Sequence, residues 1–172
     1  MPNKPARYVC ATRDKGQRTV LELLDVPHFA RWHVAGRLDL DATRIVLLAD
    51  DGAWSHRVMS PRHKCPKTYR VTLAEPLSEG NAAILKRDVQ LKNEPRRCQP
   101  TEIGRTSGME WRITVTEGKY PQVKRMFAAV VSNVVALHRK CIGAVVLDSV
   151  LAPGESRPLT ETEVTSFGSV HS

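Results

Sequence analysis

The sequence predicts an α+β fold built on a mixed, mainly antiparallel sheet. Residues 67–73 (KTYRVTL) and 111–116 (WRITVT) alternate apolar and polar side chains, the pattern of half-buried strands. Residues 122–131 place apolar side chains at the i, i+3, i+4 and i+7 positions of an amphipathic helix. These segments follow one another without regular βαβ alternation. We therefore expect antiparallel strand pairing, with short helices and loops flanking the sheet.

Shorter signals predict the remaining elements. Apolar or β-branched runs predict strands at residues 8–12, 33–35, 45–49, 134–137 and 144–147. Helix-favouring runs with start or stop residues predict short helices at 19–24, 54–59 and 78–87. A last short helix follows Thr160, which stands in capping-box spacing with Glu163. The polar segment 92–108 predicts a loop that carries one or two edge strands.

Length and charge limit the classes of function. The 172 residues fit a single domain spanning 1–172, and 26 Lys and Arg against 18 Asp and Glu give a net charge of +8. Such a balance is typical of nucleic-acid binding, although a solvated basic surface accounts for it equally well at this point. No run reaches the roughly 20 apolar residues of a membrane span, and no signal peptide opens the chain. We expect a cytoplasmic protein with no membrane partner.

Cysteine and glycine patterns give no indication of a cofactor. The four cysteines, Cys10, Cys65, Cys98 and Cys141, include no closely spaced pair of the kind that zinc sites use. We expect them to be reduced and structural. A glycine-rich phosphate loop is also missing from the sequence. The expectation is therefore no metal and no cofactor.

Two segments early in the chain bring together residues suited to chemistry. Residues 36–41 (GRLDLD) place an arginine and two carboxylates on a turn, although Asp is also a common turn and capping residue. The basic run Arg62, His63 and Lys64 leads to Lys67 and Tyr69. Basic side chains neutralise phosphates and an aromatic ring stacks on an unpaired base. A solvated loop and a core tyrosine are the simpler alternative.

A third segment, residues 117–127, joins a strand to a helix. Lys124 and Arg125 fall in the first turn of that helix, where cations oppose the helix dipole. Residues that are unfavourable for local structure, such as these two cations, often mark a functional site. Glu117 is an alternative explanation, because its carboxylate would compensate the two charges.

In this order, the three segments resemble the catalytic domain of the bacterial ribosomal-RNA pseudouridine synthases of the RsuA/RluB family. The resemblance covers residues 3 to 167. It rests on four motifs: NKP at 3–5, GRLD at 36–39, KTY at 67–69 and QVKRM at 122–126. Residues 60–63 (SPRH), 125–130 (RMFAAV) and 151–161 are closest to the RsuA-like subgroup, which modifies small-subunit rRNA.

The resemblance implies a fold, a reaction and catalytic residues. The fold is the pseudouridine synthase catalytic fold, with the active-site cleft across the sheet. The reaction detaches uracil of a specific uridine, expected in 16S rRNA, from C1′ of the ribose, rotates it and rejoins it through C5, with no cofactor. Asp39 is the implied catalytic carboxylate, either as a nucleophile or as a base that removes a ribose proton. Lys124 would pair with Asp39 and favour its charged form, and Tyr69 would stack on the uracil.

The same resemblance implies an RNA-binding surface and a partner. The partner is ribosomal RNA or the small ribosomal subunit particle, and we expect the enzyme to act as a monomer. The residues expected to contact RNA are Arg37, Arg62, His63, Lys64, Lys67, Lys119, Gln122 and Arg125.

The chain also departs from the family pattern. It opens at the NKP motif, so we expect no N-terminal RNA-binding domain of the S4 type. Arg44 stands where relatives usually have Gly, and a positive φ there would strain it. Pro121 replaces a polar or basic residue. These departures leave a second hypothesis, a catalytically weak or inactive RNA-binding paralogue acting in ribosome assembly. An Arg44 side chain filling the uridine pocket would favour it.

Overall fold

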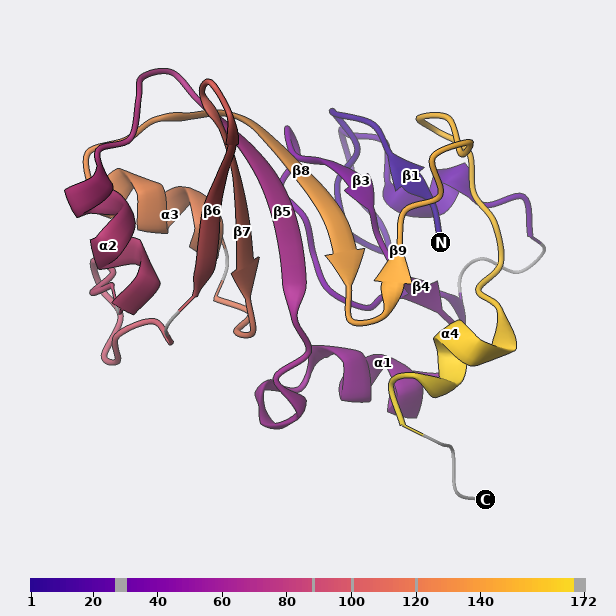
Figure 1. The fold of residues 1–172 in the computed structure, drawn as a ribbon. Helices are drawn as coiled ribbons and strands as arrows, with labels where there is room; N and C mark the ends of the chain where they lie inside the picture. Colours follow the sequence, from indigo (N-terminus) through magenta and orange to yellow (C-terminus); the bar gives the residue numbers. More distant parts are fainter. Residues whose placement is uncertain (27–30, 88, 100, 120, 169–172) are drawn as a thin grey trace.

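A sheet of long central and short outer strands forms the middle of the protein (Figure 1). The computed structural model describes residues 1–172 except 27–30, 88, 100, 120 and 169–172. The strands are β1 (Asn3–Lys4), β2 (His33–Val34), β3 (Thr43–Ile45), β4 (Leu48–Ala49), β5 (Lys67–Leu73), β6 (Glu102–Ser107), β7 (Glu110–Val115), β8 (Val134–Ile142) and β9 (Val145–Val146). The helices are α1 (Gly52–Met59), α2 (Glu79–Arg87), α3 (Gln122–Ala129) and α4 (Glu161–Thr165), with short 3-10 turns η1 (Val20–Leu23) and η3 (Pro61–His63).

The sheet is mixed and mainly antiparallel, which confirms the predicted fold class. Its strand order is β1-β3-β8-β5-β7-β6, with β9 paired to β8. Among the described strands, β3 and β8 pair parallel, and the other neighbours in this order pair antiparallel. A separate ribbon joins β2 to β4. The long strands β5 and β8 therefore form the rigid centre on which the site is built.

One face of the sheet is buried and the other is open. In β5 every second residue is buried, so Tyr69, Val71 and Leu73 point inward. The apolar sides of α2 and α3 pack on this inner face, with Leu85 and Phe127 fully buried. Figure 1 shows these two helices together at one end of the sheet, beside β6 and β7. The alternation read from residues 67–73 is confirmed, because this strand buries one side only.

A second, smaller core lies where α1 and α4 meet. The Asp51 side chain caps α1 by accepting hydrogen bonds from the backbone of Ala53 and Trp54. The Trp54 ring packs edge-on against Phe167, with centroids 5.2 Å apart, and its Nε1 donates to the Val164 carbonyl. These contacts fasten the C-terminal helix to the body of the protein. The capping box predicted at Thr160 is confirmed.

Two predicted strands are wrong. Residues 8–12 form no strand; Val9 makes only an isolated bridge to Thr19. Residues 45–49 do not form one strand, because β3 ends at Ile45, β4 begins at Leu48, and the two belong to different sheets. Val46 and Leu47 between them are fully buried. An apolar run buried on all sides has no periodicity that marks such a break.

Candidate active site

A cleft of about 180 Å³ opens between the loop after β2 and the inner face of the sheet. Loop residues 36–39 form one wall, β5 contributes Lys67 and Tyr69, and β8 contributes Leu137 and Arg139. The start of α3 and the segment before it close the far side, through Glu117, Lys119, Pro121, Gln122 and Val123. The GRLD, KTY and QVKRM segments, far apart in sequence, thus meet at one small opening.

Lys4 holds the loop that carries Asp39. Its side chain is fully buried, and its Nζ donates to the carbonyl oxygens of Asp39, Leu40 and Ala42 at 3.0, 3.1 and 2.7 Å. Burial lowers the pKa of the Lys4 ammonium. Carbonyls turned inward toward a buried cation leave this loop little freedom. The loop that presents Asp39 is therefore fixed by a strand at the start of the chain.

Arg139 holds the same loop from the other end. It lies on β8 with 1% of its surface exposed. Its guanidinium donates to the carbonyls of Gly36, Arg37 and Ile45 at 3.1, 3.0 and 2.9 Å. The planar fork of arginine suits several carbonyls at once. Two buried cations thus position residues 36–42, and Lys4 binds the Asp39 carbonyl itself.

Lys124 projects from α3 toward two carboxylates. Its Nζ lies 3.8 Å from Oδ2 of Asp39 and donates to both Oδ1 and Oδ2 of Asp41 at 2.6 Å. The pairing expected with Asp39 is present as a longer ion pair, while the hydrogen bonds go to Asp41. That contact holds the pKa of the Asp41 carboxyl below its usual range. Asp41 is 71% exposed and Asp39 only 14%, so Asp39 is the more enclosed carboxylate.

Tyr69 and Lys67 form the floor of the cleft. Both are buried residues of β5 on its inward side. The Nζ of Lys67 donates to the Cys65 carbonyl at 3.1 Å, and burial lowers the pKa of its ammonium. A flat ring and a buried cation beside a carboxylate suit a flipped pyrimidine base more than a stacked helix.

The far wall is tied together by Glu117. Its carboxylate accepts from Gln122 Nε2 at 3.0 Å and lies 3.5 Å from the Lys119 ammonium. Lys119 also donates to the carbonyls of Arg96 and Arg97. Glu117 therefore compensates cationic charge here, but of Lys119 rather than of Lys124.

Arg125, expected to contact RNA, does not line the cleft. Its guanidinium donates to Glu94 at 2.8 Å and to the Lys92 carbonyl at 2.6 Å. It fastens the loop after α2 to α3. Contact of Arg125 with RNA stays a prediction.

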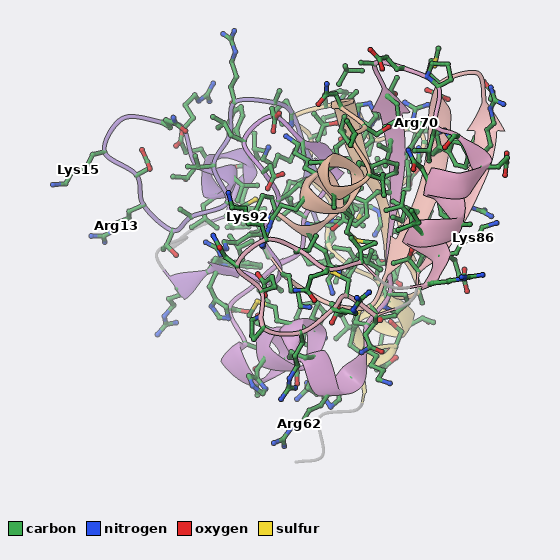
Figure 2. The ribbon with its side chains drawn as sticks, turned by 90° about the vertical axis from the view of Figure 1, so that its left-hand side faces the viewer. Arg13, Lys15, Arg62, Arg70, Lys86 and Lys92 are labelled. Atoms are coloured by element: carbon green, nitrogen blue, oxygen red, sulfur yellow. The ribbon has the colours of Figure 1, made fainter. Side chains whose placement is uncertain are left out.

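The basic run after α1 is exposed and flanks the site. Arg62, His63 and Lys64 lie on η3 and its end, and none of them lines the cleft. Figure 2 shows Arg62 at the lower edge of the molecule, pointing into solvent. Arg37, by contrast, is an exposed residue of the cleft wall.

Arg44 has the strained backbone that its position predicted, with φ at +89°. Its side chain does not enter the cleft. Instead its charge acts on His138 of β8, where it contributes, after burial and Arg70, to a lowered pKa of the imidazole. The condition that favoured an inactive paralogue is therefore not met.

The described residues contain no group of three His, Cys, Asp or Glu side chains placed to hold a metal ion. The four cysteines are free, as expected. Within the same part of the chain, no helix is both long and apolar enough to cross a bilayer.

Comparison with known proteins agrees with this geometry. The family described as RNA pseudouridylate synthase matches residues 1–129. The chain belongs to the RNA pseudouridylate synthase family. It is 53% identical over 168 residues to "Ribosomal small subunit pseudouridine synthase A" of Salmonella typhimurium, covering 98% of this chain and 73% of that protein. The protein of the same name from Escherichia coli K12 is 52% identical over 166 residues, 96% of this chain and 72% of that one.

A solved pseudouridylate synthase has the same fold. It superimposes with a TM-score of 0.91 at 45% identity, over 96% of this chain and 71% of that one. The chain is therefore a pseudouridine synthase, an enzyme that isomerises uridine to pseudouridine. The family resemblance stated from the sequence is confirmed.

Sequence reasoning missed Lys4 and Arg139, the two buried cations that hold residues 36–42. Lys4 stands out in the sequence only as part of the NKP motif. A signal existed for Arg139, because it stands at an inward position of an alternating strand, between Leu137 and Cys141. A charge at such a position is rare unless it is paired or hydrogen-bonded.

Proposed function

We propose that this chain isomerises a specific uridine of small-subunit ribosomal RNA to pseudouridine, with Asp39 as the catalytic carboxylate. One observation carries the proposal: Asp39 lies enclosed at the cleft, within ion-pair distance of Lys124 and beside Tyr69, in a member of this family. The small-subunit substrate is taken from the name of the Salmonella and Escherichia relatives. Their site of action, the ribosome, also favours the cytoplasm.

Each residue of the site has a task in the proposed reaction. The C1′–N1 bond breaks, the uracil turns within the cleft, and a C5–C1′ bond forms. The proton on C5 is lost, and N1, no longer bonded to the ribose, takes up a proton, so the product is an isomer. Asp39 acts on the ribose as a carboxylate, with the Lys124 ammonium 3.8 Å from its Oδ2. Tyr69 stacks on the base and Lys67 faces its polar edge. Arg37, Lys119 and Gln122 meet the RNA at the rim, and Arg62, His63 and Lys64 contact flanking phosphates.

We further propose that residues 1–172 act as a single catalytic domain, as a monomer, on RNA or on the small-subunit particle. The test is to incubate the protein with small- and large-subunit rRNA, each naked and as particles, and to map pseudouridine by carbodiimide-dependent primer extension. We expect a single new pseudouridine, in small-subunit RNA only. Modification of large-subunit RNA, or none in any of the four substrates, would contradict the proposal.

A further inference from the structure

The open face of the sheet carries a row of two arginines and a histidine. On β5, the outward residue Arg70 lies between inward Tyr69 and Val71. The strand register pairs Arg70 with Arg112 of β7 on one side and with His138 of β8 on the other. Arg112 and His138 likewise stand between buried neighbours on their own strands, so all three point outward in one row.

Such a row is unfavourable for the isolated protein. Side chains directly opposite on neighbouring strands lie about 5 Å apart, and like charges there destabilise a sheet. A carboxylate beside the row, that of Glu110, lies 3.8 Å from Arg70, and both side chains are about a third exposed. One such contact offsets little. Among the described residues, Nε of Arg70 is buried without a hydrogen-bond partner.

Two further cations surround the row. Arg44 and Lys140 act with Arg70 on His138 and lower the pKa of its imidazole, after the larger effect of burial. We name this group the outer patch; it consists of Arg44, Arg70, Arg112, His138 and Lys140.

The residues around the outer patch suit a phosphate backbone. Threonines at positions 43, 68, 72 and 114 lie on the same outward side. Thr68 and Thr114 share a hydrogen bond of 2.9 Å, and the Thr43 hydroxyl is hydrogen-bonded to Nδ1 of His138 at 2.5 Å. Threonine hydroxyls donate to phosphate oxygens, and arginine binds them as a fork. No Trp, Tyr or Phe belongs to the row, so bases have no ring to stack on. Strands lie about 4.8 Å apart, so three of them give a row about 10 Å long.

The outer patch faces away from the cleft, because the inward neighbours Tyr69, Leu137 and Arg139 line the cleft itself. Figure 2 shows Arg70 at the upper end of the sheet and Arg62 at the lower edge of the molecule. We propose that the outer patch binds the phosphodiester backbone of a second segment of the substrate RNA, without regard to its sequence. The inference rests on the proposed function, since it takes the RNA to be the partner.

The test removes two charges from the outer patch and, as a matched control, two from elsewhere. R70T/R112T keeps β-favouring residues on both strands. K86T/R87T removes the same charge from the exposed end of α2. Binding of small-subunit rRNA and of a 12-nucleotide RNA is measured from 50 to 300 mM salt, after thermal melting shows that both variants fold.

We expect R70T/R112T to weaken binding of the long RNA roughly tenfold and to lower its salt slope by about 1.5 to 2, as loss of two phosphate contacts requires. In R70T/R112T, binding of the 12-nucleotide RNA and turnover at saturating long RNA stay at the wild-type level. K86T/R87T leaves the affinity for the long RNA and its salt slope unchanged. An unchanged slope, or an equal fall in the control, overturns the inference. Absence of turnover in wild type, with the slope still lowered, overturns the proposed function and leaves the patch standing.

Discussion

Lys124 stands between two carboxylates of one loop, nearer to Asp41 than to Asp39. The cation thus sits at the exposed carboxylate, 3.8 Å from the enclosed one. A small shift of a long side chain is enough to exchange these partners. The sequence motif predicted the meeting of Lys124 with Asp39, but not the competition, because that depends on the loop conformation.

Replacing Lys124 by Met tests its electrostatic task. Methionine keeps the length of the side chain and removes the ion pair with Asp39. We expect turnover at saturating RNA to fall about 10- to 100-fold. Unchanged turnover would show that Lys124 does not act through Asp39. Lys124→Arg, which keeps the charge, should restore part of the activity.

Replacing Arg44 is expected to stabilise the protein. A non-glycine residue at a φ of +89° stores backbone strain, which glycine relieves. Arg44→Gly should raise the free energy of unfolding by about 1 kcal/mol in urea titrations. Turnover at saturating RNA should not change, because the side chain lies outside the cleft. Arg112→Gly is the control, since its φ is not positive, and it should destabilise the protein by about 0.5–1 kcal/mol.

At the scale of elements, the loop from β2 to β3 forms one wall of the cleft. Lys4 on β1 and Arg139 on β8 bind its carbonyls from two directions. The two-residue strand β1 is too short for any periodicity to reveal. The long alternating strand β5 was predicted with its correct ends, because one side is buried along its whole length.

Lys4→Met tests how much the hydrogen bonds from Lys4 stabilise the loop from β2 to β3. The variant leaves the carbonyls of Asp39, Leu40 and Ala42 without their buried donor, and unsatisfied buried groups cost about 1–3 kcal/mol each when they cannot reach water. We expect destabilisation of about 2–4 kcal/mol and faster amide exchange across residues 36–42. Turnover should fall even under conditions in which the variant is fully folded. Normal exchange in that loop would contradict the role given to Lys4.

At the scale of the whole molecule, the order of strands was beyond sequence reasoning. In the order β1-β3-β8-β5-β7-β6, the first strand of the chain pairs with β3, which pairs with β8. Only packing between segments distant in sequence decides this order. The sequence supported the fold class, since that needs only the kinds of element and the absence of βαβ alternation. The C-terminal segment likewise returns to pack on α1, a contact that no local pattern predicts.

The Arg157–Glu163 pair makes that C-terminal packing depend on pH. Arg157 donates two hydrogen bonds of 2.8 Å to Glu163, and these lower the pKa of the carboxyl to about 2. A lowered pKa stabilises the fold above the unfolded value near 4.5, and the stability is lost as pH falls toward 2. Glu163→Gln keeps the capping geometry and should cost about 2 kcal/mol at pH 7. Urea unfolding should show that difference shrinking between pH 5 and pH 2; a constant difference would contradict it.

The central claim is that Asp39, and not the other carboxylate of its loop, acts on the uridine. The most direct measurement is tritium release from small-subunit rRNA labelled at C5 of uridine, since that hydrogen leaves when C5 bonds to C1′. Asp39→Asn should reduce release more than about a thousandfold while RNA binding persists. Asp41→Asn, which leaves Lys124 free to pair with Asp39, should keep at least about a tenth of wild-type release. Wild-type release by Asp39→Asn, or an equal loss in both variants, would contradict the account.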